Sequence, residues 1–237
     1  MPQEHIVKSY DDELKRLRDL VARMGGLAER QVADATDALI RRDAAMAAEV
    51  VSRDAEIDAM EREIEIFCVR LLALRQPMAQ DLRLIVGALK IIHGLERIGD
   101  YAKNAAKRSI VISQQQSFGS LNGFSRMARL VQENLKGAMD ALVTNDAARA
   151  EQVWGADAPV DDIYNGIFRE MLTFMMEDAR NITVATHLLF IAKNLERIGD
   201  HATNIAETVH YAVLGDALPD ERPKADSSSY AVVRPQA

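Results

Sequence analysis

The sequence predicts an all-α protein built as two tandem, pseudo-symmetric antiparallel three-helix bundles. Aromatic residues make up only 5% of the 237 residues, whereas Ala, Leu, Ile and Met are plentiful, a composition typical of packed helices rather than β-sandwiches. Hydrophobic residues make up 48%, which is enough for a substantial core. A six-residue motif also occurs twice, which indicates an internal duplication.

The duplicated motif is Leu-Glu-Arg-Ile-Gly-Asp at residues 95–100, which recurs letter for letter at residues 195–200. The match continues to Asn104 and Asn204 at the same offset of 100, whereas upstream matches are 103 residues apart. We expect the three-residue difference in the first half at the turn containing Pro77, because proline cannot continue a helix.

Three helices are expected in the first half, at about residues 4–41, 44–74 and 78–112. In each range, apolar side chains recur at the three- and four-residue spacing of one helical face. Asp43 is suited to cap the second helix, because its carboxylate can accept hydrogen bonds from the first free backbone amides. Short turns between such helices favour antiparallel packing.

The second half repeats this pattern, with helices expected at about residues 122–143, 147–177 and 182–214. Asp146 follows a break and corresponds to the capping residue of the first half. The expected organisation is a first repeat over residues 1–112, a polar linker over 113–121, a second repeat over 122–214 and a disordered tail over 215–237.

The formal net charge of -7 argues against a general nucleic-acid-binding protein, which needs a concentrated basic surface. The N-terminus lacks the features of a signal peptide, and no segment approaches the roughly 20 apolar residues that span a bilayer. We therefore expect a cytoplasmic protein with no direct membrane insertion. The single cysteine, Cys68, lies among apolar residues and is expected to be a reduced core thiol.

Candidate functional residues lie on the duplicated motif. On an ideal helix, Leu95 and Ile98 belong to the core stripe, whereas Glu96 and Asp100 lie together on a stripe roughly 140° away and are expected to face outward. The glycine within each motif copy should let another backbone approach closely.

The helix expected before each motif copy also carries acidic residues one turn apart. If neighbouring helices bring these pairs together, each half gains a site of four carboxylates. The acidic stripe of the first half continues to Glu61 and Glu65, whereas Tyr164 and Phe168 interrupt the second. The candidate metal ligands are Asp54, Asp58, Glu96 and Asp100 in the first half, and Asp157, Asp161, Glu196 and Asp200 in the second.

Oxygen ligands suit magnesium, calcium and manganese, and carboxylate clusters also hold iron. We expect bound metal ions, with iron, manganese, magnesium and zinc as candidates. A solvated acidic face with Arg97 and Arg197 in surface ion pairs is the alternative. His93 lies three residues before Glu96, the reverse of the order in ferritin-type di-iron enzymes and in one half only, so the histidines add little.

The sequence contains no glycine-rich phosphate loop, no nucleophile elbow and no Cys/His zinc pattern. We therefore expect no catalytic site and no enzyme activity. The alternative is a metal-dependent phosphohydrolase that uses the carboxylate clusters, because paired metals can activate water.

The two motif copies, each followed by Tyr/His-Ala-x-Asn, and Arg-Gln-Pro-Met-Ala-Gln-Asp-Leu-Arg at residues 75–83 resemble the PhoU family over about residues 5–213. The resemblance implies two three-helix bundles, metal clusters on the Glu/Asp-x-x-x-Asp motifs and a homodimer. It also implies a role in phosphate homeostasis: negative regulation of the phosphate-starvation (Pho) regulon and of phosphate uptake. The implied mechanism is an adaptor between the ATPase of the phosphate ABC importer and the phosphate-sensing histidine kinase.

Overall fold

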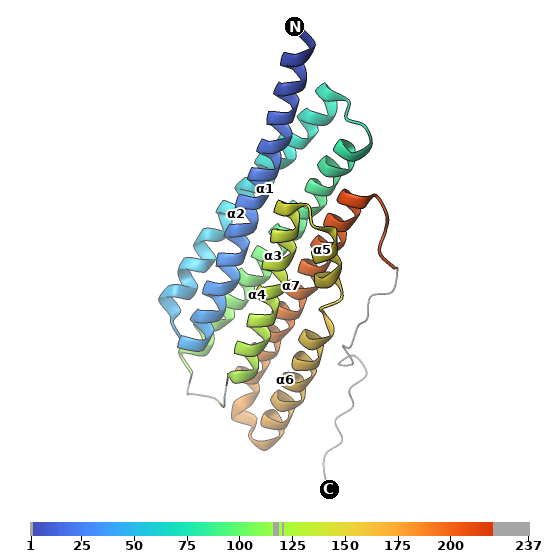
Figure 1. Cartoon of the computed structure of the whole chain (residues 1–237). Helices are drawn as coiled ribbons and strands as arrows, with labels where there is room; N and C mark the ends of the chain where they lie inside the picture. Colours follow the sequence, from blue (N-terminus) through green and yellow to red (C-terminus); the bar gives the residue numbers. More distant parts are fainter. Residues whose placement is uncertain (1, 116–118, 120, 220–237) are drawn as a thin grey trace.

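The structure, a computed structural model, describes residues 2–115, 119 and 121–219, with side chains from residue 9 onward. The predicted all-α class is confirmed (Figure 1). Most of the predicted disordered tail, 220–237, and part of the predicted linker lie outside the described residues. The helices are α1 (Pro2–Arg41), α2 (Ala44–Arg75), α3 (Ala79–Ser113), α4 (Asn122–Thr144), α5 (Ala147–Trp154), α6 (Ala158–Glu177) and α7 (Ile182–Leu214), with a 3₁₀ turn, η1 (Ala179–Asn181), before α7.

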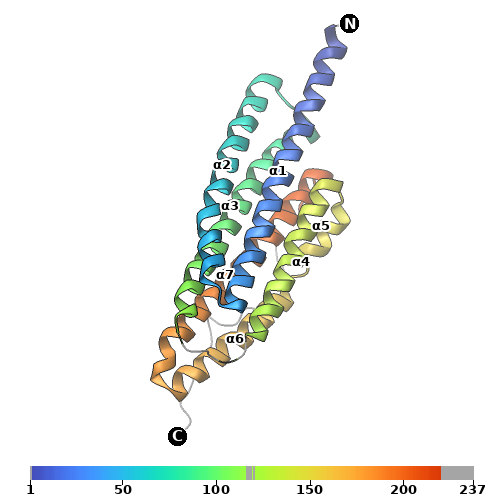
Figure 2. The ribbon, with the colours of Figure 1, turned by 90° about the vertical axis from the view of Figure 1, so that its left-hand side faces the viewer.

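The helices form the two predicted three-helix bundles. One contains α1, α2 and α3, and the other contains α4, α7 and the α5–α6 pair (Figures 1 and 2). The bundles join mainly along α3 and α7, and also where α1 contacts α4. Gly87 of α3 faces Ala212 of α7, whereas Gly94 faces Ile205, so the two helices run antiparallel.

The prediction of one helix over residues 147–177 is wrong, because the structure has α5 and α6 in that range. Pro159 lies in the first turn of α6, where its missing N–H costs nothing. In a continuous helix, the ring of Pro159 would clash with the carbonyl of Gly155, which instead ends α5. The break places Asp157 immediately before α6 rather than inside a helix.

The predicted helix caps are confirmed. The side chain of Asp43 accepts hydrogen bonds from the backbone amides of Ala45 and Met46, and Asp146 accepts one from Arg149. The break expected at Pro77 lies between α2 and α3. These features agree with the local sequence because each depends on one or two neighbouring residues.

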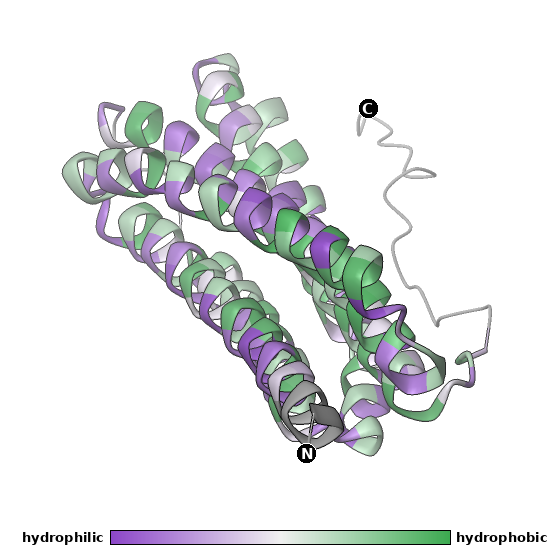
Figure 3. Cartoon of the chain, turned by 90° about the horizontal axis from the view of Figure 1, so that it is seen from above, coloured by the Kyte–Doolittle hydropathy of each residue, from purple (hydrophilic) through white to green (hydrophobic). Residues whose placement is uncertain are grey.

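The core is apolar and continuous across both bundles. Met24 and Met127, which correspond in the duplication, are fully buried. Cys68 is buried as predicted, and burial raises the pKa of its thiol to about 12. Hydrophilic and hydrophobic residues alternate along the helices in Figure 3, and within the described ranges no helix has the length and apolar content needed to cross a bilayer.

Candidate metal centres

The first candidate centre lies where α2 and α3 approach each other at Gly99. A Cβ atom at this position would lie 3.0 Å from Ile57 Cδ1 and 3.5 Å from Asp54 Oδ1. The absence of a side chain therefore lets α2 lie against the motif, and brings Asp54 close to the α3 backbone. The sequence predicted that another backbone would approach here, whereas the atoms nearest to Gly99 belong to the side chains of Ile57 and Asp54.

Asp54 is buried and already has two partners. The side chain of Gln31 donates a hydrogen bond of 3.0 Å to Asp54 Oδ1 and one of 3.2 Å to the carbonyl oxygen of Gly99. The ammonium of Lys103 binds Asp54 and also donates to Asp100 Oδ1 at 2.6 Å. Burial alone would lower the pKa of Lys103, but its hydrogen bonds to Asp100 and Asp54 outweigh that effect and raise it. The protein thus supplies its own cation between these two predicted ligands.

Glu96 is in a different environment, with Glu61 and His93. Ligand atoms of these three side chains all lie within 4.8 Å of one another, and His93 Nδ1 is 3.5 Å from Glu61 Oε1. Among the described residues, no other set of three or more His, Cys, Asp or Glu side chains is this close. Burial, followed by the charges of Asp100 and Glu61, raises the pKa of Glu96. We name this set the histidine trio.

The histidine trio was not predicted from the sequence. His93 had no equivalent in the second half, and Glu61 was read only as part of an acidic stripe. The usable signal was the spacing: residues 93 and 96 are three apart on one helix, and therefore share a face. Asp58 is half-buried one turn beyond Asp54 and does not belong to the trio.

The second candidate centre lies between α6 and α7. Asp157, Asp161 and Glu196 are buried, and Asp200 is half-buried. The expectation that the motif glutamates face outward is therefore wrong for Glu196 and only partly right for Glu96, which is half-buried. One difference lies in the neighbouring helix: the buried ring of Tyr164 stands where the first half has the half-buried Glu61, and it lies against Lys193, which binds Glu196.

Glu196 is compensated by a lysine from its own helix. Lys193 donates to Glu196 Oε1 at 2.9 Å, and its ammonium also lies 4.9 Å from the ring centre of Tyr164. Glu196 Oε2 is buried without a hydrogen-bond partner, 3.8 Å from the guanidinium of Arg197. Burial raises the pKa of Glu196, whereas Lys193 opposes that rise.

Among the described residues, the potential metal ligands that lie closest together belong to the first centre. The histidine trio offers one nitrogen and two carboxylates, a combination that zinc, iron and manganese accept. In the second centre, Lys193 replaces His93 and Tyr164 replaces Glu61. Asp54 and Asp100 are bound by Lys103, so a cation there would have to displace an ammonium.

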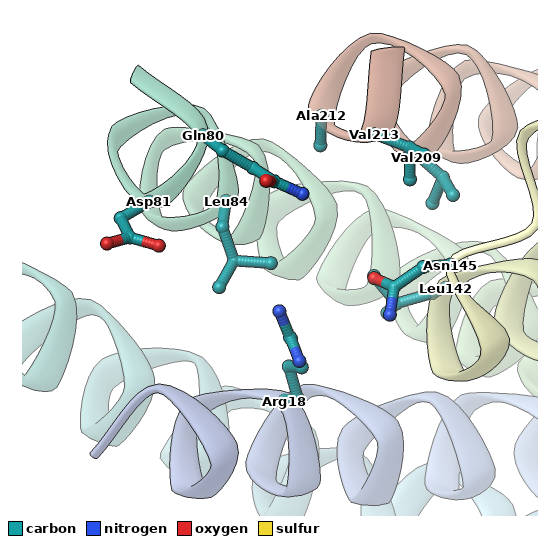
Figure 4. A pocket seen from close by; sticks show the side chains of 9 residues that line it. All are labelled: Arg18, Gln80, Asp81, Leu84, Leu142, Asn145, Val209, Ala212 and Val213. Atoms are coloured by element: carbon teal, nitrogen blue, oxygen red, sulfur yellow. The ribbon is translucent and has the colours of Figure 1, made fainter. Parts of the chain in front are cut away.

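A separate small cavity, of about 20 Å³, lies near the beginning of α3 and the end of α7 (Figure 4). Arg18 reaches towards it from α1, Leu84 and Gln80 line it from α3, and Val209 lines it from α7. This volume suits a water molecule rather than an organic ligand, and no predicted ligand lines it.

Comparison with known proteins relates both halves to one family. A family model described as "PhoU domain" matches residues 21–109 and again 124–209. A "Phosphate-specific transport system accessory protein PhoU homolog" from Caulobacter vibrioides is 53% identical over 224 residues, which cover 94% of this chain and 97% of the relative. A relative of the same name from Rhizobium meliloti is 46% identical over 230 residues, which cover 97% of each chain.

Two solved structures share the fold. The crystal structure of PhoU from Pseudomonas aeruginosa matches with a TM-score of 0.83 at 42% identity, covering 87% of this chain and 100% of that one. The phosphate transport system regulatory protein PhoU from Streptococcus pneumoniae matches with a TM-score of 0.82 at 28% identity, covering 89% of this chain and 99% of that one. The similarity therefore extends over nearly the whole helical body.

Proposed function

This chain belongs to the PhoU family, and from that premise we propose that it is a cytoplasmic negative regulator of the Pho regulon and of phosphate uptake. The observation that carries the proposal is the 53% identity, over 94% of the chain, to an accessory protein of the phosphate-specific transport system. Regulation rather than catalysis is also consistent with the two centres, where Asp54, Asp100 and Glu196 are bound by lysine or glutamine side chains.

The proposed mechanism is that of an adaptor between two proteins, the ATPase of the phosphate ABC importer and the phosphate-sensing histidine kinase. The two bundles of this chain have the same architecture but differ in side chains, so each can offer a distinct surface. When phosphate is plentiful, contact with both partners would keep the kinase from activating the regulon. A homodimer, which the family resemblance implies, would double these surfaces.

We further propose that the histidine trio holds a metal ion. Glu61 lies on α2, whereas His93 and Glu96 lie on α3, so an ion bound by all three would link the two helices. The ion would supply positive charge that offsets the repulsion between Glu61 and Glu96, which helps to raise the pKa of Glu96. The trio would thereby stabilise the surface formed by α2 and α3.

The adaptor function is tested in a strain that lacks this protein and carries a phosphate-starvation reporter. We expect the wild-type protein to restore repression in high phosphate and to recover the kinase or the ATPase in a pull-down. Expression of the reporter at the same level with and without the protein would contradict the proposal.

The double variant Glu61→Gln and Glu96→Gln tests whether the histidine trio binds a metal ion. The control is Glu133→Gln, because Glu133 is an exposed residue on α4.

One observation favours a second candidate function, a metal-dependent phosphohydrolase. Catalytic zinc sites have three protein ligands and leave a position for water, and the histidine trio also has three ligands. Hydrolysis of phosphate esters with manganese or zinc, lost in Glu96→Gln, would favour this function. A lack of turnover with a range of phosphate esters, together with the pull-down, would favour the adaptor.

A further inference from the structure

A basic strip runs along the exposed junction of α3 and α7. We name this strip the basic seam. It lies beside the two candidate centres, yet neither the metal proposal nor the comparisons assign it a role. Its cations are Lys90, Arg97 and Arg108 of α3 and Arg197 of α7, and its aromatic residues are Tyr101, Phe190, His201 and Tyr211.

The centre of the basic seam is where the two motif copies meet. The rings of Tyr101 and His201 lie 5.7 Å apart, one from each copy, and Arg97 and Arg197 are about half exposed beside them. Burial lowers the pKa of His201, and the charges of His93, Arg97 and Arg197 lower it further, whereas Asp200 opposes this. Arg97 is 3.6 Å from Glu96 and Arg197 is 3.8 Å from Glu196, distances longer than a hydrogen bond. Both guanidiniums therefore keep donors for a partner.

The two ends of the basic seam differ, although the duplication relates them. At one end, the guanidinium of Arg108 lies 4.0 Å from the ring centre of Phe190 and 3.4 Å from His187 Nδ1, so side chains fill the junction. Phe190 remains half exposed and offers an apolar contact.

At the other end, the positions equivalent to Arg108, Phe190 and His187 are occupied by Thr208, Lys90 and Gly87. The shorter side chains at two of these positions leave an open groove of about 310 Å³. Val86 and Tyr211, both exposed, contribute apolar surface to its wall, and Glu207 is the one carboxylate among its described lining residues. The groove has room for one large apolar side chain beside a basic strip.

We propose that the basic seam binds an acidic amphipathic helix of a partner protein. Carboxylates on that helix would meet Arg97 and Arg197, and one apolar side chain would enter the groove at Gly87. The charge of the basic seam is complementary to such a helix, although the whole chain is acidic at -7. A helix about 10–12 Å wide also fits over two helices whose axes are about 8–10 Å apart.

Two other occupants fit the basic seam less well. A second copy of this chain would bring one set of arginines against another, and like charges oppose that contact. A nucleic acid is broader than one helix and uniformly anionic, so it would also meet carboxylates beside the basic seam, such as Glu61 of α2, which lies beside His93. The inference rests on the proposed adaptor function only in that it needs a protein partner.

The test uses the full-length protein and a fluorescent helical peptide of about 20 residues, long enough to span about 30 Å. The peptide carries glutamates along one face and a single phenylalanine, and a second peptide has alanine in its place. We expect Arg97→Glu with Arg197→Glu to weaken binding of both peptides at least about tenfold. The matched control is Arg62→Glu with Arg126→Glu, an equal charge change on exposed arginines of α2 and α4.

Thr208→Trp tests the groove separately. We expect it to weaken binding of the phenylalanine peptide and to leave binding of the alanine peptide unchanged, because the indole would occupy the space for the phenylalanine ring.

Equal peptide binding by the seam variant, Arg97→Glu with Arg197→Glu, and by its matched control would overturn the proposal. So would tighter binding of an oligonucleotide than of the peptide, or a dimer of the wild type that the seam variant converts to a folded monomer.

The reporter strain separates this inference from the proposed function. Failure of the wild-type protein to restore repression would contradict the adaptor function, whatever the peptide shows. Restored repression together with peptide binding that does not depend on Arg97 and Arg197 would contradict the inference about the basic seam but not the adaptor function. A seam variant that stays folded, binds neither peptide and fails to repress would support both.

Discussion

The two carboxylate centres carry the same six-residue motif, but they place their internal cation on opposite sides of it. In the first centre, Lys103 follows the motif and binds Asp54 and Asp100. In the second centre, Lys193 precedes the motif and binds Glu196. An identical motif therefore does not make an identical site, because the residues one turn before and after it decide which carboxylate is neutralised.

This difference leaves a different acid available in each half. Glu96 has no lysine partner in the structure's described part, and lies near Glu61 and His93. Glu196 is bound by Lys193, and Tyr164 stands where the first half has Glu61. We therefore expect the first centre to bind a metal ion more tightly than the second.

The largest expected effect follows removal of the bridging lysine. Lys103→Met should destabilise the metal-free protein by about 3 kcal/mol, because breaking a buried ion pair leaves uncompensated carboxylates. Lys193→Met should cost less, since Lys193 binds a single carboxylate and its side chain is 33% exposed against 21% for Lys103. Urea unfolding in the presence of a chelator measures both. Equal losses in the two variants would contradict the difference drawn between the centres.

The next effect concerns metal affinity. His93→Ala should weaken zinc or manganese binding at least about tenfold, because it removes one of three ligands. Isothermal titration calorimetry measures the affinity and the number of ions, with His187→Ala, a histidine near Arg108, as the matched control. Unchanged binding in His93→Ala would exclude the trio as the site.

Transplanting the trio sharpens the same comparison. The double variant Lys193→His and Tyr164→Glu gives the second half the ligand types of the first. We expect the titration to show one additional ion per chain, because Glu196 loses its lysine and gains two potential co-ligands. A stoichiometry equal to that of the wild type would mean that burial of Glu196, rather than Lys193, prevents binding.

The motif glycines should respond with opposite signs to alanine. Gly199→Ala should stabilise α7 by up to about 1 kcal/mol, since its Cβ would be 3.5 Å from Val160, an ordinary contact. Gly99→Ala should destabilise the protein by about 1 kcal/mol, because Ile57 Cδ1 would lie at 3.0 Å and must move. Thermal unfolding of both variants measures the signs. Stabilisation by both would show that α2 adjusts without cost.

The internal repeat, and features set by one or two neighbouring residues, could be predicted from the sequence. The motif repeat gave the two bundles, and Asp43, Asp146 and Pro77 marked helix ends correctly. The break before α6 was also readable, because Pro159 and Gly155 are four residues apart, but the strength of the repeat favoured one continuous helix.

Features set by packing between helices could not be read in the same way. Helical spacing placed Glu96 and Glu196 away from the core stripe of their own helices, but it did not give the burial of Glu196, which depends on the side chains that α6 packs against α7. Lys103 was missed because it lies outside the repeated letters, with Thr203 at the equivalent position. The histidine trio was missed because its members come from two helices and occur in one half.

The smallest expected effect is a difference in how pH acts on the two motif glutamates. The folded-state pKa of each is raised, so each contributes stability that is fully present below the unfolded pKa and is lost as pH rises through the folded pKa. Glu96→Gln and Glu196→Gln should therefore each gain stability relative to the wild type as pH rises from about 4.

Salt should separate the two glutamates. After burial, the main cause for Glu96 is repulsion from Asp100 and Glu61, which salt screens, so the advantage of Glu96→Gln should shrink at high ionic strength. For Glu196, the next cause is attraction to Lys193, so salt should not shrink the advantage of Glu196→Gln. Urea unfolding of the metal-free variants at low and high sodium chloride measures this. The same salt response in both would mean that burial alone governs the two acids, and that the lysines matter less than their geometry indicates.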